Sequence, residues 1–394
     1  MKKKKFSLGK TVFLCVLAAA VGLVVGVVAP LYVAEGYFTR NITTDELIAK
    51  NGYYYSGDIS GRTVSVDEAD VSVHFLELGN KYTGDCTLIK VGDTEVLIDC
   101  GSRENSVPTV KRYLDEYVTD GILEYVIVTH AHQDHYAGFA TSEKTASIFD
   151  LYDCKTIIKF ARTNQKNTAK TYNNFIRELG EAESRGANVY DSLQCVNETD
   201  GAKKVYDLSD NVKMEILYQK FYEEKANGEN DYSVCCMISS GENKLLFTGD
   251  LEGDGEKSLA DWYKDKYGVE NVDVTLYKAG HHGSKTSSTE YFLNTFRPGI
   301  CCVCCCAGST EYTTIAANTF PTQTFINNIS KYTDKVYVTT LCIDYAKDEY
   351  KSFNGNIVVC VKDKSVSVSC SGNDKPLKES DWYKQNRTSA YWDT

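Results

Sequence analysis

Five of the six histidines in this 394-residue chain lie in two short clusters. The first cluster, residues 129–135, reads Thr-His-Ala-His-Gln-Asp-His and contains His130, His132, Asp134 and His135. The second cluster, residues 278–284, reads Lys-Ala-Gly-His-His-Gly-Ser. Imidazoles and a carboxylate at this density are typical ligands of transition-metal ions. Histidines scattered over core and surface are the alternative, but the H-x-H-x-D-H spacing argues against it.

One further carboxylate would turn these clusters into a site for two metal ions. His130 and His132 can hold one ion from one side. Asp134 and His135 can turn toward a second ion, and Asp250 in Thr-Gly-Asp can bridge the two. Two ions held in this way activate a hydroxide for attack on phosphorus or a carbonyl carbon, and they stabilise the leaving oxygen.

The remaining site candidates lie beside these ligands. We expect His281 to be the metal ligand of the second cluster because it comes first after a predicted strand, and His282 to be a proton donor, although the two roles could be exchanged. Lys278 could neutralise a phosphate oxygen or could be an ordinary solvated lysine. Asp99 ends a predicted strand, where it would orient a ligand histidine or serve as a turn residue.

The elements that must position these residues follow from the hydrophobic pattern. Strands are predicted at residues 74–78, 86–90, 95–99, 123–129, 212–218, 233–239, 244–248 and 272–278. Helices are predicted from Ser106 to Gly121 and over residues 169–185, and a hairpin over residues 356–370. Each candidate ligand then follows the end of a strand, where mixed sheets covered by helices place their chemistry.

The N-terminal segment predicts a membrane anchor. Residues 1–10 contain five lysines, residues 11–33 are uncharged, and Glu35 is the first acid. An apolar run of this length crosses a bilayer as one helix, and the lysines place residues 1–10 in the cytoplasm. We therefore expect a single-pass protein of the cell membrane with an extracytoplasmic domain. A cleaved signal peptide, and hence secretion, is the alternative.

The rest of the chain divides into a spacer, one domain and a tail. Residues 34–69 are predicted to be a juxtamembrane spacer, residues 70–372 the domain, and residues 373–394 a polar tail. The formal net charge of −11 argues against binding nucleic acid through the overall field of the protein. A nucleic-acid substrate would have to be held locally, by metal ions and a few nearby cations.

The fifteen cysteines would suggest disulfides in an exported chain, but their placement favours packing. Five of them surround Val303 in one apolar run, residues 301–306. Such a run predicts a strand buried on both faces, in which cysteine serves as a small hydrophobic side chain.

Together these motifs resemble the metallo-β-lactamase superfamily, and more narrowly the metallo-hydrolase domain of the competence DNA-uptake channel protein ComEC and its stand-alone relatives. The motifs are Phe75-Leu76-Glu77-Leu78-Gly79 with Gly84-Asp85, Leu97-Ile98-Asp99-Cys100-Gly101, the first cluster, Phe247-Thr248-Gly249-Asp250-Leu251-Glu252, and the second cluster. The resemblance implies an α/β (α+β) fold, the αββα sandwich, here behind a single transmembrane helix. It also implies two divalent ions, zinc or manganese, and hydrolase activity, with phosphodiesters as the leading substrate class.

Two of the places where the chain departs from this pattern concern metal binding. Many members of the superfamily have another ligand histidine between the first cluster and the bridging aspartate, but there is none here between Tyr136 and Asp250. Competence-type relatives often show His-Pro after the second cluster, where this chain has Phe320-Pro321. We therefore expect either that one of the two ions is weakly held or that the site holds a single ion.

The leading hypothesis is a membrane-anchored, extracytoplasmic phosphodiesterase that acts on extracellular nucleic acid or on a cell-wall polymer, with no protein partner evident. A phosphorylcholine esterase, a lactamase or a thioester hydrolase is an alternative on the same fold. A hypothesis of a different class is a non-catalytic ectodomain that binds a surface polymer or a partner. Metal content would distinguish such a binder from an enzyme.

Overall fold

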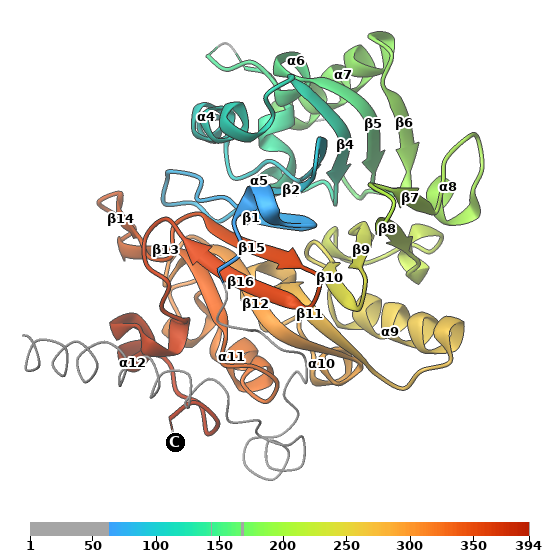
Figure 1. The fold of residues 1–394 in the computed structure, drawn as a ribbon. Coiled ribbons are helices and arrows are strands. Elements are labelled where there is room, and N and C mark those ends of the chain that lie inside the picture. The colour runs from blue at the N-terminus through green and yellow to red at the C-terminus, as the bar shows by residue number, and fades with distance from the viewer. Residues whose placement is uncertain (1–62, 143, 167–168, 394) are drawn as a thin grey trace, which may run out of the picture. The chain divides into compact units, whose positions relative to one another are not determined.

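The computed structural model describes residues 63–393 except residues 143, 167 and 168. The predicted anchor at residues 11–33 and most of the predicted spacer lie outside the described residues. Within the described part, none of the helices combines the length and the apolar composition that a bilayer-spanning segment requires. The strands of this part form two mixed sheets of eight strands each (Figure 1).

The first sheet has the strand order β16-β15-β1-β2-β3-β4-β5-β6. Its strands are β1 (Val71–Phe75), β2 (Thr87–Val91), β3 (Thr94–Ile98), β4 (Ile122–Val128), β5 (Asp153–Lys159), β6 (Asn188–Asp191), β15 (Ile357–Lys362) and β16 (Ser365–Cys370). Strands β3 to β6 run parallel, whereas the C-terminal hairpin β15–β16 pairs antiparallel with β1, with Phe75 opposite Ile357. The predicted hairpin therefore extends the first sheet beside its first strand.

The second sheet has the strand order β14-β13-β12-β11-β10-β9-β8-β7. Its strands are β7 (Val205–Asp207), β8 (Val212–Leu217), β9 (Cys235–Ser240), β10 (Asn243–Phe247), β11 (Val272–Lys278), β12 (Phe296–Ala307), β13 (Val336–Asp344) and β14 (Glu349–Ser352). Strands β10 to β13 run parallel, so their carboxyl ends meet at one edge of the sheet. The loops after β10 and β11 carry Asp250 and the second cluster to that edge.

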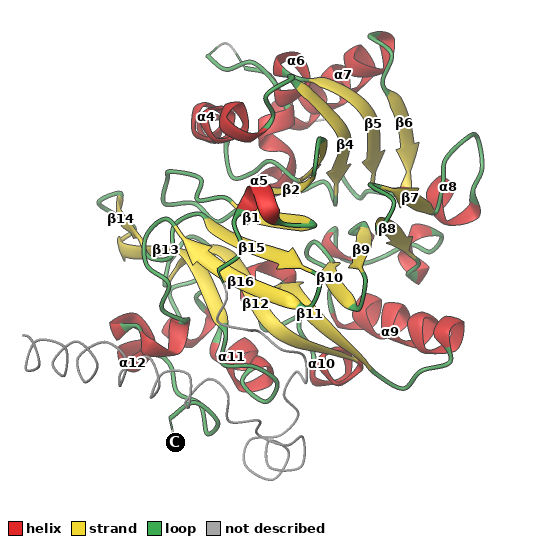
Figure 2. Cartoon of the chain, in the orientation of Figure 1, coloured by secondary structure: helices red, strands yellow, loops and turns green. Residues whose placement is uncertain are grey.

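Helices flank the two sheets (Figure 2). They are α4 (Val107–Tyr117), α5 (Gln133–Tyr136), α6 (Ile148–Leu151), α7 (Lys170–Ser184), α8 (Ser192–Asn197), α9 (Gly253–Tyr267), α10 (Glu290–Thr295), α11 (Gln323–Ile329) and α12 (Asp381–Asn386). Side chains of α4 and α7 pack with the first sheet, and those of α9, α10 and α11 pack with the second. The architecture is a mixed α/β sandwich built on two large sheets.

The cysteine-rich strand β12 shows how the layers are held together. Cys302 and Cys304 belong to the core that contains residues of both sheets, whereas Cys301, Val303 and Cys305 belong to the core against the helices of the second sheet. Both faces of the strand are thus buried, as the apolar run predicted, because side chains alternate between the two faces of a strand. Every cysteine of the described residues is a free thiol.

The C-terminal segment differs from its sequence-based description, and helix α9 is absent from that description. Residues 373–394 were expected to form a polar tail, yet Leu377, Tyr383 and Trp392 are buried in the core of the second sheet. Only a few apolar side chains anchor this mostly polar segment to the core. Its overall composition therefore does not reveal that it packs against the second sheet. Helix α9 is likewise not predicted from the sequence, because its mostly polar residues give little hydrophobic periodicity.

His74, the histidine outside the two clusters, is a buried residue of strand β1. Its ring nitrogens lie 2.9 Å from Ser72 Oγ and 2.8 Å from Tyr113 Oη. Burial, helped by the charge of Lys90, lowers the pKa of His74 to about 3. This value is below the ordinary histidine pKa of an unfolded chain, so the contribution of neutral His74 to stability is complete above about pH 6.5 and is lost as the pH falls toward 3.

We expect the variant His74→Gln to be less sensitive to acid than the wild-type protein. The titration of His74 should cost the wild type about 2 kcal/mol of unfolding free energy between pH 7 and pH 5, and glutamine does not titrate. Chemical denaturation at both pH values measures this difference, and Tyr113→Phe, which loses the same contact but keeps the titrating His74, is a control that should stay sensitive to acid. An equal loss of stability in His74→Gln and the wild type would contradict the assignment.

Candidate metal centre

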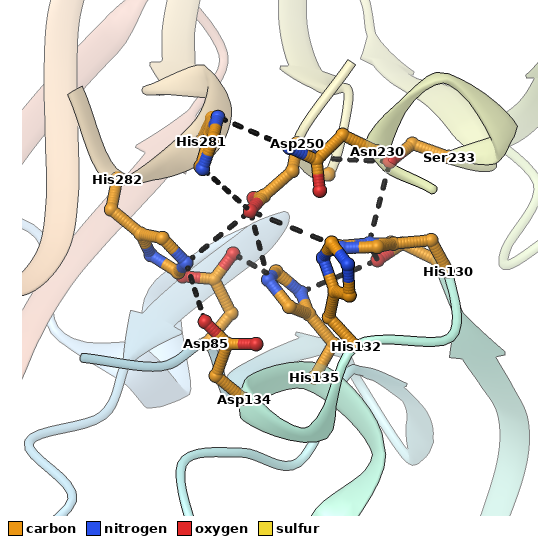
Figure 3. Close-up of polar contacts among 12 residues, drawn as sticks. Asp85, His130, His132, Asp134, His135, Asn230, Ser233, Asp250, His281 and His282 are labelled. Atoms are coloured by element: carbon orange, nitrogen blue, oxygen red, sulfur yellow. Dashed lines mark hydrogen bonds and ion pairs between the residues drawn. The ribbon is translucent and has the colours of Figure 1, made fainter. Parts of the chain in front are cut away.

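The first cluster follows strand β4 and enters the short helix α5. His130 and His132 lie in the connecting loop, and α5 begins at Gln133, so Asp134 and His135 lie in its first turn. His130 and His135 are buried, whereas His132 and Asp134 are partly exposed. The change from extended to helical backbone turns both pairs of side chains toward the edge of the second sheet (Figure 3).

The second cluster and Asp250 come from that edge, and both loops contain unusual backbone. His281 and His282 have φ values of +46° and +54°, in the left-handed region that non-glycine residues rarely adopt. Such residues cost on the order of 1–3 kcal/mol each and gather at functional sites. Gly249, which precedes Asp250, has φ +52°, and a Cβ atom there would lie 2.8 Å from Ser233 Oγ.

Four buried side chains form the tightest group of potential ligands. They are Asp85, His135, Asp250 and His282, and one ligand atom of each lies within 4.8 Å of the others. Asp250 Oδ2 lies 3.2 Å from His135 Nε2 and 3.4 Å from His282 Nε2. Asp134 Oδ2 also lies 3.4 Å from His282 Nε2. The structure thus brings Asp134, His135 and Asp250 together, with His282 rather than His281 at the centre of the group.

A second group lies on the other side of Asp250. His130 Nε2 and His132 Nδ1 are 3.1 Å apart, a separation that suits two ligands of one ion. Asp250 Oδ2 lies 4.0 Å from His130 Nε2 and 3.9 Å from His281 Nε2. One oxygen of Asp250 therefore faces both groups of ligands, as a bridging carboxylate must (Figure 3).

Lys278 lies inside this site rather than on the surface. Its side chain is buried and forms an ion pair with Asp85, and its Nζ lies 3.8 Å from Asp250 Oδ1. Burial alone would lower the pKa of Lys278, but Asp85 and then Asp250 outweigh it and hold the pKa above its usual range. The ammonium of Lys278 already serves as counter-ion to these carboxylates, and its contact with a substrate phosphate stays a prediction.

Asp99 lies directly behind His135. Its carboxylate accepts hydrogen bonds from the backbone N–H and the hydroxyl of Thr129, both at 2.7 Å, and its Oδ2 lies 2.7 Å from His135 Nδ1. The contact fixes the ring of His135 so that Nε2 points to Asp250. A carboxylate behind a ligand histidine orients the ring and raises its basicity.

Backbone hydrogen bonds tie the loop of Asp85 to the first cluster. Asp85 N–H donates to the carbonyl of Asp134 at 3.0 Å, and Gly101 N–H donates to the carbonyl of Asp85 at 2.7 Å. A Cβ atom on Gly101 would lie 1.6 Å from Asp134 O, so only glycine allows the loops to approach this closely. The glycine after Asp99 and Cys100 is therefore needed to bring Asp85 to the site.

The electrostatics of the site agree with a requirement for cations. Burial alone would lower the pKa of His135 and His282, but neighbouring carboxylates outweigh it and hold both pKa values well above the usual range. Asp250 contributes most to this effect at both rings, followed by Asp99 at His135 and by Asp85 at His282. Protons on these rings would be displaced when a divalent ion binds.

The donor set fits divalent metal ions. Within the described residues, Asp85 Oδ1, Asp250 Oδ1, His135 Nε2 and His282 Nε2 are buried and make no hydrogen bond. Buried polar atoms normally find partners, so a cluster of such ligand atoms indicates that an ion belongs among them. Four carboxylates, those of Asp85, Asp99, Asp134 and Asp250, meet one lysine here, and divalent ions would balance the remaining charge.

Asp85 is the main site residue that the sequence did not identify as a ligand. It lies in the loop between β1 and β2, not after a strand that leads to the site, and no neighbouring histidine marks it. In the sequence, Gly84-Asp85 stands out only through the resemblance to the metallo-β-lactamase superfamily. Tyr312, which donates a hydrogen bond to Asp134 Oδ2 at 3.1 Å, was missed as well, because nothing in its local sequence distinguishes it.

We expect Asp85→Asn to weaken the binding of one ion by roughly 10- to 100-fold, because the amide keeps the shape but not the charge of a ligand. The loss also leaves Lys278 without its partner, so the metal-free variant should be less stable. Elemental analysis after dialysis against a metal buffer measures the change. The exposed Asp93→Asn is the matched control, and two ions held with wild-type affinity would contradict the role of Asp85.

Comparisons with known proteins agree with this geometry. Residues 79–148 match the family model described as the metallo-beta-lactamase superfamily. Recombination protein 2 of Haemophilus influenzae is 36% identical over 72 residues, which are 18% of this chain and 8% of that protein. Competence protein ComA of Neisseria gonorrhoeae is 39% identical over 89 residues, which are 23% of this chain and 12% of that protein.

These matches cover a small part of the relatives, 8% and 12% of their lengths. Among solved structures, the metallo-beta-lactamase fold protein YhfI of Bacillus subtilis is 13% identical, covering 68% of this chain and 96% of that protein with a TM-score of 0.38. The matched residues 79–148 contain Asp85, Asp99 and the whole first cluster. The resemblance to the metallo-β-lactamase superfamily is thereby confirmed, and a competence protein is among the relatives of this chain.

Proposed function

We propose that this protein is a divalent-metal-dependent phosphodiesterase. The observation that carries the proposal is the position of Asp250 Oδ2, which lies 3.2–4.0 Å from ring nitrogens of His135, His282, His281 and His130 on its two sides. A carboxylate shared between two groups of ligands suits a pair of divalent ions. Such ions supply a nucleophile at neutral pH and stabilise the charge that develops on phosphate oxygens.

The proposed ligands form two sets that share Asp250. His130 and His132 would hold one ion, and a set of four side chains would hold the other: Asp85, Asp134, His135 and His282. The buried position of His282 among carboxylates supports a ligand role for it, which reverses the roles expected from the sequence.

His281 is better suited to move a proton. Its side chain keeps 22% of its exposure, and its Nδ1 lies 3.1 Å from Glu252 Oε1. A histidine held by a carboxylate at the open side of a site can give a proton to a leaving oxygen. The rings of His281 and Phe320 lie 5.6 Å apart, and those of Tyr312 and Phe320 lie 5.7 Å apart, so aromatic groups border the same side.

Nucleic acid is the phosphodiester that we propose as substrate. The relatives named as a competence protein and a recombination protein favour it over a cell-wall polymer. Because the net charge of the chain is −11, the nucleic acid would have to be held by groups at the site itself and not by the overall field of the protein. Lys278 is occupied by Asp85, so the bound ions and the exposed Lys285 would contact the phosphate.

We also propose that the enzyme acts outside the cytoplasm, anchored by residues 11–33. The uncharged length of this segment and the lysines before it support the proposal. Fusion of reporter enzymes that are active on only one side of the membrane, placed after residue 62, would test the orientation of the chain.

We expect the full chain, purified in detergent, to hydrolyse a chromogenic phosphodiester when manganese or zinc is supplied. Asp134→Ala should reduce the rate by at least about 100-fold, because it removes a proposed ligand that also contacts His282. Asp210→Ala, a change at an exposed aspartate, is the matched control.

Absence of hydrolysis with every metal tried would refute the phosphodiesterase proposal. If the chromogenic substrate is cut, single-stranded DNA, double-stranded DNA and a teichoic-acid polymer should then be compared at equal phosphate concentration. A clear preference for the wall polymer would refute the assignment of nucleic acid while leaving the phosphodiesterase activity in place.

A further inference from the structure

The side-chain amide of Asn230 reaches the metal centre from the turn before strand β9 (Figure 3). Its Nδ2 lies 3.1 Å from Glu252 Oε1 and 3.3 Å from His281 Nδ1. A carboxylate oxygen only accepts hydrogen bonds, so the NH₂ end of the amide must face Glu252. The opposite end, the carbonyl oxygen Oδ1, is therefore directed away from Glu252 and His281.

The carbonyl oxygen of Asn230 has no partner within the described part of the chain. Asn230 is only 8% exposed, and its Oδ1 is buried without a hydrogen bond. In Figure 3 this oxygen points into the ring of site residues. A buried amide oxygen without a partner is uncommon, and its placement inside a group of metal ligands points to a ligand of its own.

The turn that carries Asn230 is held firmly. Gln219 Nε2 donates to the carbonyl of Asp231 at 2.7 Å, and Ser233 N–H donates to the carbonyl of Asn230 at 3.0 Å. Ser233 Oγ in turn accepts the backbone N–H of Asp250 at 3.0 Å. The turn is thus fastened to the backbone of Asp250, and the amide of Asn230 is positioned before any ion binds.

The ion proposed for His130 and His132 lacks a further protein ligand. Those two imidazoles and the shared Asp250 provide three donors, whereas the ion on the other side has a richer set. Structural and catalytic sites commonly provide four or more donors, some of them water. The chain has no additional histidine between residues 136 and 250 to supply one, but it has Asn230 there.

We propose that Asn230 Oδ1 is a protein ligand of the ion held by His130, His132 and Asp250. This inference rests on the proposed two-ion site and adds a residue to it. An amide oxygen changes the donor set from one dominated by imidazole to two nitrogens and two oxygens. Oxygen donors favour manganese and magnesium, whereas imidazole favours zinc, so the site containing Asn230 should accept manganese readily.

Metal binding to the full chain, freed of metal with a chelator and kept in detergent, tests the proposal without reference to activity. Manganese is titrated by calorimetry, and free manganese is counted by electron paramagnetic resonance. The wild type should bind two ions per chain. Asn230→Ala should weaken one of them by about 10- to 100-fold and leave the other unchanged.

Two further variants separate a ligand role from a structural one. Asn230→Asp keeps an oxygen donor at this position but, like alanine, loses the NH₂ group that donates to Glu252, so it should bind the weakened ion more tightly than Asn230→Ala, with a larger rise of Tm on adding manganese. Asn243→Ala removes another buried asparagine, outside the metal centre, and should leave both affinities unchanged. Because both variants at position 230 lose the hydrogen bond to Glu252, a purely structural role of the amide would affect them alike, and tighter binding by aspartate than by alanine identifies the ligand oxygen.

The outcomes also separate this proposal from the proposed activity. Two ions bound by Asn230→Ala with wild-type affinities would overturn the ligand role, even if the protein hydrolyses phosphodiesters. Selective loss of one ion in Asn230→Ala would support the ligand role, even if no phosphodiester is hydrolysed. Binding of a single ion by the wild type with no effect of Asn230→Ala would also overturn it.

Discussion

The buried carboxylate of Asp250 is the group around which the site is arranged. Its Oδ2 lies within 4.0 Å of four ring nitrogens, and its Oδ1 lies 3.8 Å from Lys278 Nζ. An ionised carboxylate inside a protein is strongly unfavourable unless opposite charge lies close to it. Lys278 supplies part of that charge, and the proposed divalent ions would supply the rest. The loops of the site bring cations and candidate metal ligands to the carboxylate of Asp250.

The loops of the two sheets converge on one region, and this brings positive charge and candidate metal ligands close to Asp250. Parallel strands β10 and β11 bring Asp250 and His282 to one edge, and the loops after β3 and β4 bring Asp99 and the first cluster to the same place. A backbone hydrogen bond from Asp85 to Asp134, and one from the backbone N–H of Asp250 to the hydroxyl of Ser233, connect these loops to one another. The left-handed backbone of His281 and His282 is strained, and the packed strands around it would hold it in place.

The acidic character of the chain and its proposed substrate are compatible for a local reason. Phosphodiesters carry negative charge, yet the chain has a net charge of −11 and its most central lysine is already paired with Asp85. The proposed ions would bind because of the carboxylates and would then present positive charge to the phosphate. The carboxylates that repel a polyanion at long range would therefore hold the ions that attract its phosphate groups at short range.

Much of the fold and site followed from the sequence. The helices near residues 106–121 and 169–185, the buried cysteine strand and the strands before each ligand loop were predicted, because periodicity and turn residues are local signals. The first cluster is a local signal as well, since its four candidate ligands lie within six residues. Helix α9 and the packing of the C-terminal segment were not predicted, because a few apolar residues in polar sequence leave little periodic signal.

The tertiary structure alone decided which residues meet. Asp85 and Asn230 reach the site from loops distant in sequence, and no spacing rule connects them to the histidines. The left-handed backbone of both residues places His282 Nε2 beside Asp134 and Asp250 and His281 Nδ1 beside Glu252, which the sequence does not reveal. The sequence identifies Lys278 as a cation beside the second cluster. Only the structure shows that it is buried and paired with Asp85. The types of the ligands are a local property of the sequence, whereas their partners are set by the packing of two sheets.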